Sequence, residues 1–315
     1  MEKNAKIYIA GHRGLAGSAI TRALRRQGYE NLLLKSSSEL DLRDQQATES
    51  FFSREKPKYV FDAAAKVGGL QANSTYRADF MYDNIQIQNN LVHSSWKHGV
   101  QKFLFLGSNC IYPKDCPQPM KEEHLWTGLL EPTNQPYAVA KLAGIEMCQA
   151  YSFQHGADFI SVIPASIYGP QDNYDLTHAH IIPTLITKCH EAKVRGEEEV
   201  KIPGSADRRR EMLYADDMAD ACFFLMQHYD SSEVINIGTN KDHTVRELAN
   251  LVKDVVGFEG EVLFETGKPT GMLLKFLDSK KITDLGWKAP TDIREGLEKA
   301  YQWFLEHVAP QGDYC

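Results

Sequence analysis

Tyr137 and Lys141 form the first pair of side chains in the sequence that could do acid–base chemistry. They are four positions apart in a stretch predicted to be helical, so both lie on one helix face. A tyrosine with an ordinary pKa near ~10 exchanges protons poorly at neutral pH. A neighbouring ammonium stabilises the phenolate and suits the hydroxyl for proton transfer beside a hydride-transfer site. With 14 tyrosines in the chain, one such pair is expected by chance, so its position must decide its meaning.

That position is set by Ser108, which comes directly after the apolar run 103–106. This run is predicted to be a buried strand, and doubly wound parallel sheets build their sites at the carboxyl ends of strands. Ser108, Tyr137 and Lys141 are therefore predicted to share one site.

A glycine-rich segment follows the first predicted strand, residues 7–10, and opens a predicted helix; it reads Gly11-His12-Arg13-Gly14-Leu15-Ala16-Gly17. Glycines at this spacing allow a tight turn, a close backbone approach to a pyrophosphate, and close packing of helix on strand. The helix N-terminus adds partial positive charge. The alternative is that these are turn glycines alone, but the strand–loop–helix context predicts dinucleotide binding.

The end of the second predicted strand bears on the choice of dinucleotide. In an NAD-binding protein, an Asp or Glu directly after Leu34 would hydrogen-bond the ribose 2′-hydroxyl. The residues there are Lys35-Ser36-Ser37-Ser38 instead. Arg13 can also face the ribose. Two cations and no carboxylate favour NADPH, the alternative being that Lys35 is an ordinary solvated lysine.

Apolar runs of strand length alternate with helical stretches, and this alternation predicts the elements that position these residues. Strands are predicted at 7–10, 32–34, 59–62, 103–106, 159–163, 233–237 and 262–264, and helices at 18–27, 44–54, 79–98, 138–155, 178–190, 244–256 and 292–307. Nearly continuous apolar strands are buried on both faces, so the fold class is α/β with a doubly wound parallel Rossmann sheet. We assign residues 1–166, with about 212–240, to a dinucleotide-binding domain. The remainder, about 167–211 and 241–315, forms a smaller substrate-binding lobe.

Composition restricts the classes of function. Hydrophobic residues make up 43% of the 315-residue chain, which excludes a disordered protein. The 35 basic and 42 acidic residues give a net charge of −7, which argues against broad nucleic-acid binding. We expect no signal peptide, membrane span or metal site, and six cysteines without a CxxC pair indicate a reducing compartment; the expected location is cytoplasmic.

The glycine loop, Ser108 and the Tyr137–Lys141 pair resemble the extended short-chain dehydrogenase/reductases in order and spacing. Within that family, hexose 4,6-dehydratases carry an Asp-Glu pair after the serine, and simple 4-epimerases lack a cysteine there. This chain has Asn109-Cys110 instead, and it resembles the GDP-L-fucose synthases over almost its whole length. The matching segments are 11–20, 63–69, 107–114, 119–120, 130–134, 136–138, 168–170, 172–173, 216–218, 268–269, 277–278 and 301–304, with His180 and Pro183.

The resemblance implies NADPH-dependent epimerisation at C3 and C5 and reduction at C4 of GDP-4-keto-6-deoxy-D-mannose. It implies that Cys110 is the base and His180 the acid of the epimerisations, and that Ser108 and Tyr137 hydrogen-bond the enolate oxygen. Tyr137 and Lys141 then serve the reduction. The implied NADP(H)-binding residues are Gly11, His12, Arg13, Gly14, Leu15, Ala16, Gly17, Lys35, Ser36, Asp41, Leu42, Ala63, Ala64, Leu106, Gly107, Tyr137, Lys141, Pro164, Ile167 and His180. The implied substrate-binding residues are Ser108, Asn109, Asn173, Lys188, Arg210 and Asp278.

Four departures from the family pattern leave the sugar open: Ser37 replaces an arginine, Ala165 and Ser166 replace Thr-Asn, and Pro203 stands in the segment that usually carries a tryptophan. A colitose-type or heptose keto sugar is an alternative substrate. A non-catalytic NADP(H)-sensing protein is a second alternative, which the catalytic side chains argue against. Without the resemblance, Cys110 alone would be read as a small buried residue. The resemblance also implies a homodimer.

Overall fold

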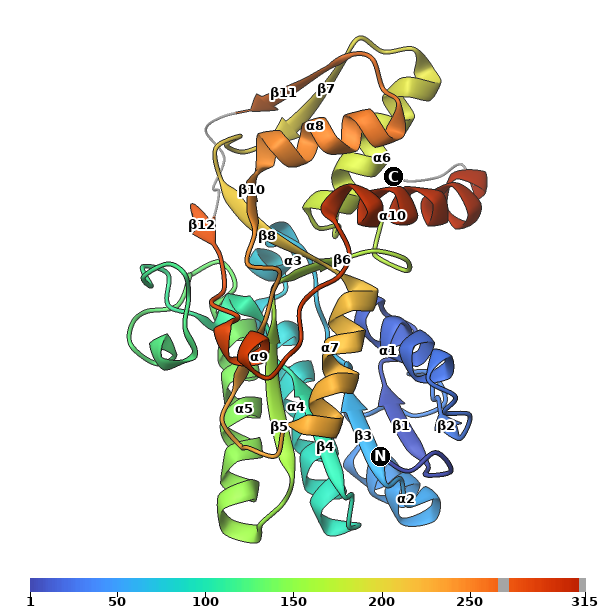
Figure 1. The fold of residues 1–315 in the computed structure, drawn as a ribbon, viewed down its shortest axis with the longest axis vertical. Helices are drawn as coiled ribbons and strands as arrows, with labels where there is room; N and C mark the ends of the chain where they lie inside the picture. Colours follow the sequence, from blue (N-terminus) through green and yellow to red (C-terminus); the bar gives the residue numbers. More distant parts are fainter. Residues whose placement is uncertain (266–271, 312–315) are drawn as a thin grey trace.

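A computed structural model describes residues 1–265 and 272–311, and its larger lobe is built on a parallel six-stranded sheet (Figure 1). The strand order is β2-β1-β3-β4-β5-β9. The strands are β1 Ile7–Ala10, β2 Leu32–Leu33, β3 Tyr59–Asp62, β4 Lys102–Leu106, β5 Phe159–Pro164 and β9 Ile235–Ile237. All of them except β2 are buried along their whole length, as strands covered on both faces must be.

Two layers of helices cover this sheet. On one face α4 packs against both α2 and α5, and on the other α1 packs against α7. Their bounds are α1 Leu15–Arg26, α2 Gln45–Glu55, α4 Arg77–Lys97, α5 Gln135–His155 and α7 Ala215–His228. Because β1 lies between β2 and β3, the direction of winding reverses there, and a crevice is expected at the carboxyl ends of β1 and β3. The predicted Rossmann fold is confirmed.

The smaller lobe lies above the carboxyl ends of these strands in Figure 1 and is centred on β8, Arg209–Tyr214. Strand β8 pairs with β6, β10 and β12, while β7 pairs with β11. The strands are β6 Ser166–Tyr168, β7 Glu199–Pro203, β10 Asp242–Thr244, β11 Glu261–Glu265 and β12 Leu274–Lys275; the helices are α6 Ile181–Arg195, α8 Val245–Val256 and α10 Ile293–His307. Shorter elements are α3 Leu70–Thr75, α9 Lys280–Asp284, and the 3₁₀ turns η1 Asn109–Ile111, η2 Glu122–His124 and η3 Ala309–Gln311.

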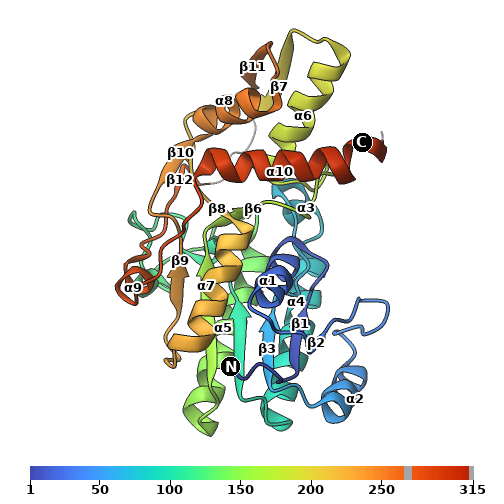
Figure 2. The same cartoon turned by 45° about the vertical axis from the view of Figure 1, so that its right-hand side comes forward.

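The chain crosses between the lobes more than once (Figures 1 and 2). It leaves the large sheet after β5, builds β6, α6 and β7 in the smaller lobe, and returns through β8 and α7 to add β9 beside β5. Later residues cross again, since Leu277, Ile282 and Trp287 pack in the hydrophobic core of the larger lobe. The domain boundaries given above stay a prediction.

Several predicted elements differ in detail. Helix α6 begins at Ile181 rather than at residue 178, because the residues before it form a separate turn around Asp175. The Asp175 side chain accepts a hydrogen bond from the N–H of Thr177, and its carbonyl oxygen accepts from the N–H groups of His178 and Ala179. Helix α6 also continues to Arg195, beyond the predicted end at residue 190, and β7 begins at Glu199. No helix of the described part is long and apolar enough to cross a bilayer. Lys268 and Pro269, in one of the matching segments, and Cys315, one of the six cysteines, lie outside the described residues.

Candidate active site

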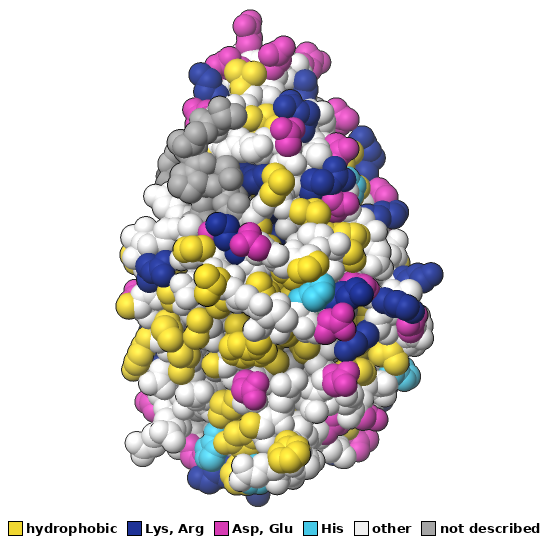
Figure 3. Space-filling model, turned by 90° about the vertical axis from the view of Figure 1, so that its left-hand side faces the viewer, with side chains coloured by type: hydrophobic (Ala, Val, Ile, Leu, Met, Phe, Trp, Pro, Cys, Tyr) yellow, Lys and Arg dark blue, Asp and Glu magenta, His cyan; other side chains and the backbone are white. Residues whose placement is uncertain are grey.

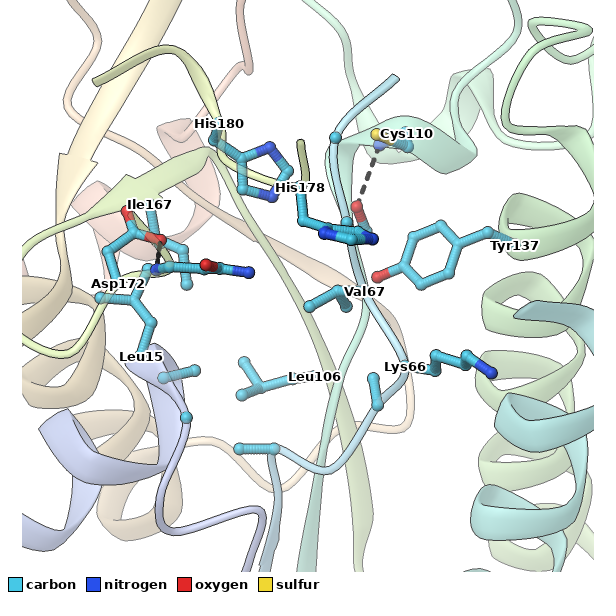
Figure 4. Close-up of a pocket in the computed structure, with 18 of the residues that line it drawn as sticks. Leu15, Lys66, Val67, Leu106, Cys110, Tyr137, Ile167, Asp172, His178 and His180 are labelled. Atoms are coloured by element: carbon cyan, nitrogen blue, oxygen red, sulfur yellow. Dashed lines mark hydrogen bonds between the residues drawn. The ribbon is translucent and has the colours of Figure 1, made fainter. Parts of the chain in front are cut away.

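A cavity of about 1180 Å³ lies at the carboxyl ends of the large sheet, between the two lobes (Figure 4). One drug-sized ligand needs roughly 300–1,000 Å³, so the cavity has room for more than one such molecule. It brings together most of the predicted site residues: Gly11, His12, Arg13, Gly14, Leu15, Ala16, Lys35, Ser36, Asp41, Leu42, Ala63, Ala64, Leu106, Gly107, Ser108, Asn109, Cys110, Tyr137, Lys141, Pro164, Ile167, Asn173, His180 and Arg210.

The glycine loop is packed too closely for other side chains. Gly11 has φ +76°, and a Cβ there would lie 2.6 Å from the carbonyl oxygen of Ala63. A Cβ on Gly17 would collide with the backbone of Gly11. Gly17 therefore lies under the loop rather than at the cavity wall, and it serves helix–strand packing. A Cβ on Gly14 would come no closer than 3.6 Å to any atom, so space is free on that side.

The N-terminus of α1 faces this loop and fits a diphosphate. Its N-cap residue, Gly14, has no side chain, and its first turn carries no acidic residue. The first N–H groups of a helix have no partner within the helix, and here they meet the cavity. The loop can therefore hold the anionic part of a dinucleotide.

Charged groups surround the neighbouring end of the cavity, where a 2′-phosphate is expected. Lys35 pairs with Glu39 at 3.5 Å, and the Glu39 carboxylate also accepts hydrogen bonds from the backbone N–H and hydroxyl of Ser36. Arg43 lines the same end and pairs with Asp41 at 2.8 Å. Sequence reasoning included Lys35 and Arg13 but missed Arg43, whose role depends on the fold of the segment after β2.

Tyr137 lies in the first turn of α5, and its hydroxyl points into the cavity (Figure 4). Burial and the nearby Cys110 raise the pKa of Tyr137, and a hydrogen bond with Ser108 acts in the opposite direction. The hydroxyl therefore keeps its proton at neutral pH. The ammonium of Lys141 donates 2.8 Å to the carbonyl oxygen of Leu106. Burial lowers the pKa of Lys141, and the buried carboxylate of Asp62 opposes that shift.

Cys110 and His180 reach the cavity from different parts of the chain (Figure 4). Cys110 lies in η1, directly after β4, and His180 is the N-cap of α6. Burial alone would raise the pKa of the Cys110 thiol, but Lys275, Ser108 and Arg210 together bring it below its ordinary value. Burial and then Lys275 lower the pKa of His180.

Two predicted substrate residues are not brought to the cavity. Lys188 lies one turn beyond Thr184, the last cavity-lining residue of α6, and its ammonium donates 2.7 Å to the carbonyl oxygen of Lys201. The Asp278 carboxylate accepts a hydrogen bond from the Lys280 N–H at 2.9 Å. Both assignments to the substrate stay predictions.

Arg210 does line the cavity, from strand β8. Its guanidinium donates to the carbonyl oxygens of Met272 and Leu273 at 2.7 and 3.2 Å, which fixes its orientation. All four sequence departures, Ser37, Ala165, Ser166 and Pro203, also line the cavity. The hydroxyl of Ser166 accepts a hydrogen bond from the Asn109 side chain at 3.3 Å.

The structure adds cavity residues that sequence reasoning did not assign. Lys275 is the most informative, since its ammonium lies 3.2 Å from the Cys110 sulfur. Its only sequence signal is a charge inside an apolar run two residues before Leu277. Burial raises the pKa of Asp172 to about 7, and one of its carboxylate oxygens is buried without a partner. Within the described ranges, no cluster of His, Cys, Asp and Glu suits a metal ion.

Comparisons with known proteins agree with this geometry. The model of the family described as "NAD dependent epimerase/dehydratase family" matches residues 7–238. The chain is 54% identical to GDP-L-fucose synthase 1 of Arabidopsis thaliana over 98% of its own length and 95% of that protein. A GDP-6-OMe-4-keto-L-xylo-heptose reductase from C. jejuni superposes with a TM-score of 0.93 at 36% identity, covering 97% of this chain and 99% of the other. A GDP-L-fucose synthetase from Naegleria fowleri bound to NADP superposes with a TM-score of 0.90 at 28% identity, covering 98% of this chain and 96% of the other.

Proposed function

Since the chain belongs to the NAD dependent epimerase/dehydratase family, we propose that it converts GDP-4-keto-6-deoxy-D-mannose to GDP-L-fucose. The reaction comprises epimerisation at C3 and C5 and NADPH-dependent reduction at C4. One observation carries the proposal: a single cavity receives the thiol of Cys110, the imidazole of His180 and the hydroxyl of Tyr137. A reductase needs the hydroxyl, and an epimerase that works at two carbons also needs a base and an acid.

The protein is an NADP-dependent oxidoreductase, and the site fits that cofactor. The open N-terminus of α1 suits the diphosphate, and the cations at the far end suit a 2′-phosphate. We assign the diphosphate to the loop 11–16 and the 2′-phosphate to Arg13, Lys35 and Ser36. When bound, NADPH supplies the hydride for reduction of the C4 ketone.

The epimerisations use the acidity that a C4 ketone gives to the protons on C3 and C5. The thiolate of Cys110 takes such a proton, leaving an enolate and a neutral thiol, and His180 returns a proton to the opposite face of the carbon. The lowered pKa of His180 makes its protonated form a strong proton donor. Ser108 and Tyr137 donate hydrogen bonds to the enolate oxygen, where charge develops.

Tyr137 completes the reduction by protonating the C4 oxygen. Its raised pKa keeps the hydroxyl protonated, which is the form a proton donor requires. Lys141, held by the carbonyl oxygen of Leu106 and close to the ring of Phe105, lines the same cavity as Tyr137. Arg210 supplies a fixed guanidinium for the diphosphate of the substrate.

A related heptose substrate is the second candidate, because the heptose reductase shares the fold closely and Ser166 and Pro203 alter the cavity wall. A colitose-type keto sugar fits the same reasoning. The decisive experiment is incubation of the enzyme and NADPH with a panel of GDP-4-keto sugars, followed by NMR of the products. We expect GDP-L-fucose from the keto-deoxy-mannose, and no product from Tyr137→Phe. If only a GDP-linked heptose is converted, that heptose is the substrate in place of GDP-4-keto-6-deoxy-D-mannose. If no sugar is converted, the alternative of a non-catalytic protein that senses NADP(H) is favoured.

The proposal includes a homodimer in the cytoplasm. Hydrophobic side chains gather on the lower half of the face in Figure 3, the side on which α5 lies in Figure 1. Exposed hydrophobic residues of α4 and α5 include Met81, Tyr82, Trp96 and Phe153. Large exposed apolar patches are typical of protein interfaces. A reducing compartment suits the free thiol that Cys110 must keep.

A further inference from the structure

Lys275 and Cys110 meet although they are far apart in the sequence and belong to different lobes. Cys110 follows β4 of the large sheet, and Lys275 lies on β12 of the smaller lobe. Strand β12 runs parallel to β8, with Lys275 in register with Arg210. The ammonium of Lys275 donates to the Cys110 sulfur at 3.2 Å.

The surroundings of the thiol combine one strong cation with weaker polar groups. Ser108 accepts a hydrogen bond from the Cys110 N–H at 3.3 Å, and the Asn109 side chain faces the sulfur at 3.7 Å. Arg210 adds a second, more distant positive charge, and Tyr137 faces the sulfur from α5. Burial of the sulfur opposes ionisation, so the direct contact with Lys275 decides the balance.

The contact is not required to hold strand β12 in place. The backbone N–H of Phe276 donates to the side chain of Gln118, and that of Leu277 donates to the buried carboxylate of Glu211. The residues after the strand are fixed further by the hydrogen bond between the Asp278 N–H and the carbonyl oxygen of Met120. The side chain of Lys275 is therefore free to serve the cavity.

We propose that Lys275 is a positioning residue that keeps Cys110 as a thiolate in the resting site. The inference rests on the proposed function, in which Cys110 is the base of the epimerisations. In that step the C–H proton moves to sulfur, the electron pair of the C–H bond moves into the enolate, and the ammonium of Lys275 keeps its charge. One residue of the smaller lobe therefore sets the starting state of the base on the larger lobe.

The test is a titration of the Cys110 thiol in the intact enzyme. The rate of alkylation by iodoacetamide is followed by mass spectrometry of the Cys110 peptide between pH 5.5 and 9.5. Lys275→Met should raise the pKa of the thiol by about one unit or more, so that alkylation at pH 7 slows about tenfold. Lys275→Arg should restore most of the rate. Lys280→Met removes an equal charge from α9, outside the cavity, and should leave the titration unchanged.

Two outcomes separate this inference from the proposed function. If Lys275→Met and the wild type have the same alkylation profile, Lys275 does not control the thiol, whatever the reaction is. If Cys110→Ser still exchanges the C3 and C5 protons for solvent deuterium, the base role is wrong although the titration still holds. Should Lys275→Met fold poorly, Lys275→Gln is titrated in its place, with circular dichroism as the check on folding.

Discussion

Cys110 and Tyr137 face the same cavity but serve different steps of the proposed reaction. A serine hydroxyl has nearly the shape of the thiol and does not ionise at neutral pH. Cys110→Ser should therefore lower the rate of deuterium exchange at C3 and C5 by at least about a hundredfold, while NADPH oxidation on a substrate that needs no epimerisation is retained. Exchange is measured by NMR in D₂O with NADP⁺ present, so that no reduction occurs. Exchange at the wild-type rate would rule out the thiol as the base.

Asp172 is expected to make stability depend on pH. Its pKa in the folded protein is about 7, raised by burial, against about 3.9 in an unfolded chain. The folded state therefore binds more protons between about pH 4 and 7, and the free energy of unfolding falls as pH rises through this window. Asp172→Asn should become more stable than the wild type across it, by up to about 1.4 kcal/mol per pH unit.

Urea unfolding of both proteins at pH 5 and pH 8 checks this expectation. His12, His180 and His190 have lowered pKa values and act in the opposite direction, but they are present in both proteins and cancel in the difference. A difference that is the same at both pH values would show that the carboxyl of Asp172 ionises normally.

At the scale of elements, two glycines of the glycine loop have different roles: one serves packing and the other ligand binding. Gly17→Ala places a methyl group against the backbone of Gly11 and should destabilise the fold by about 1–3 kcal/mol. Gly14→Ala meets only ordinary contacts, so its melting temperature should stay close to that of the wild type. Because Gly14 lines the cavity, that variant should instead raise the Kd for NADPH. Thermal melts and fluorescence titration of both variants test the contrast, and equal destabilisation by both would contradict it.

The strands of the large sheet could be predicted because they are short apolar runs between helices. Strand β8 could not, since it begins with two arginines, whereas β7 alternates polar and apolar residues, a signal of a half-buried strand that sequence reasoning missed. Strand β12 has only two residues, and its position depends on pairing with β8. For the same reason Lys275 was missed: the sequence near it says nothing about Cys110, and only the tertiary fold joins them.

Among the predicted site residues, those on the large sheet were located well because motif and strand end coincide there. Lys188 and Asp278 were assigned by resemblance alone; neither lines the cavity, and each side chain makes a hydrogen bond to a nearby backbone group. Pattern matching reports which residues recur at a position, but it does not report the direction in which a side chain points.

At the scale of the whole molecule, the proposed homodimer predicts a mass about twice 35.6 kDa by light scattering. Tyr82, on α4, is 62% exposed, and Tyr82→Asp should shift the population toward monomer, because a carboxylate would be buried in the interface. Val194→Asp is the matched control: Val194 is 72% exposed on α6 of the smaller lobe, and its variant should remain dimeric. A monomeric wild type would rule out the homodimer, and equal loss of the dimer in both variants would place the interface elsewhere.

The repeated crossing of the chain between lobes has a consequence for how the protein folds. Strand β9 reaches its place beside β5 only after some 70 intervening residues have built part of the smaller lobe, and α7 closes over α1 on the same return. Contacts between such distant segments carry a large loop-closure cost and form late. A nascent chain that ends after β5 would therefore expose an unpaired strand edge and an uncovered helix. The two lobes should emerge as one cooperative unit, with the cavity between them forming in the last stage of folding.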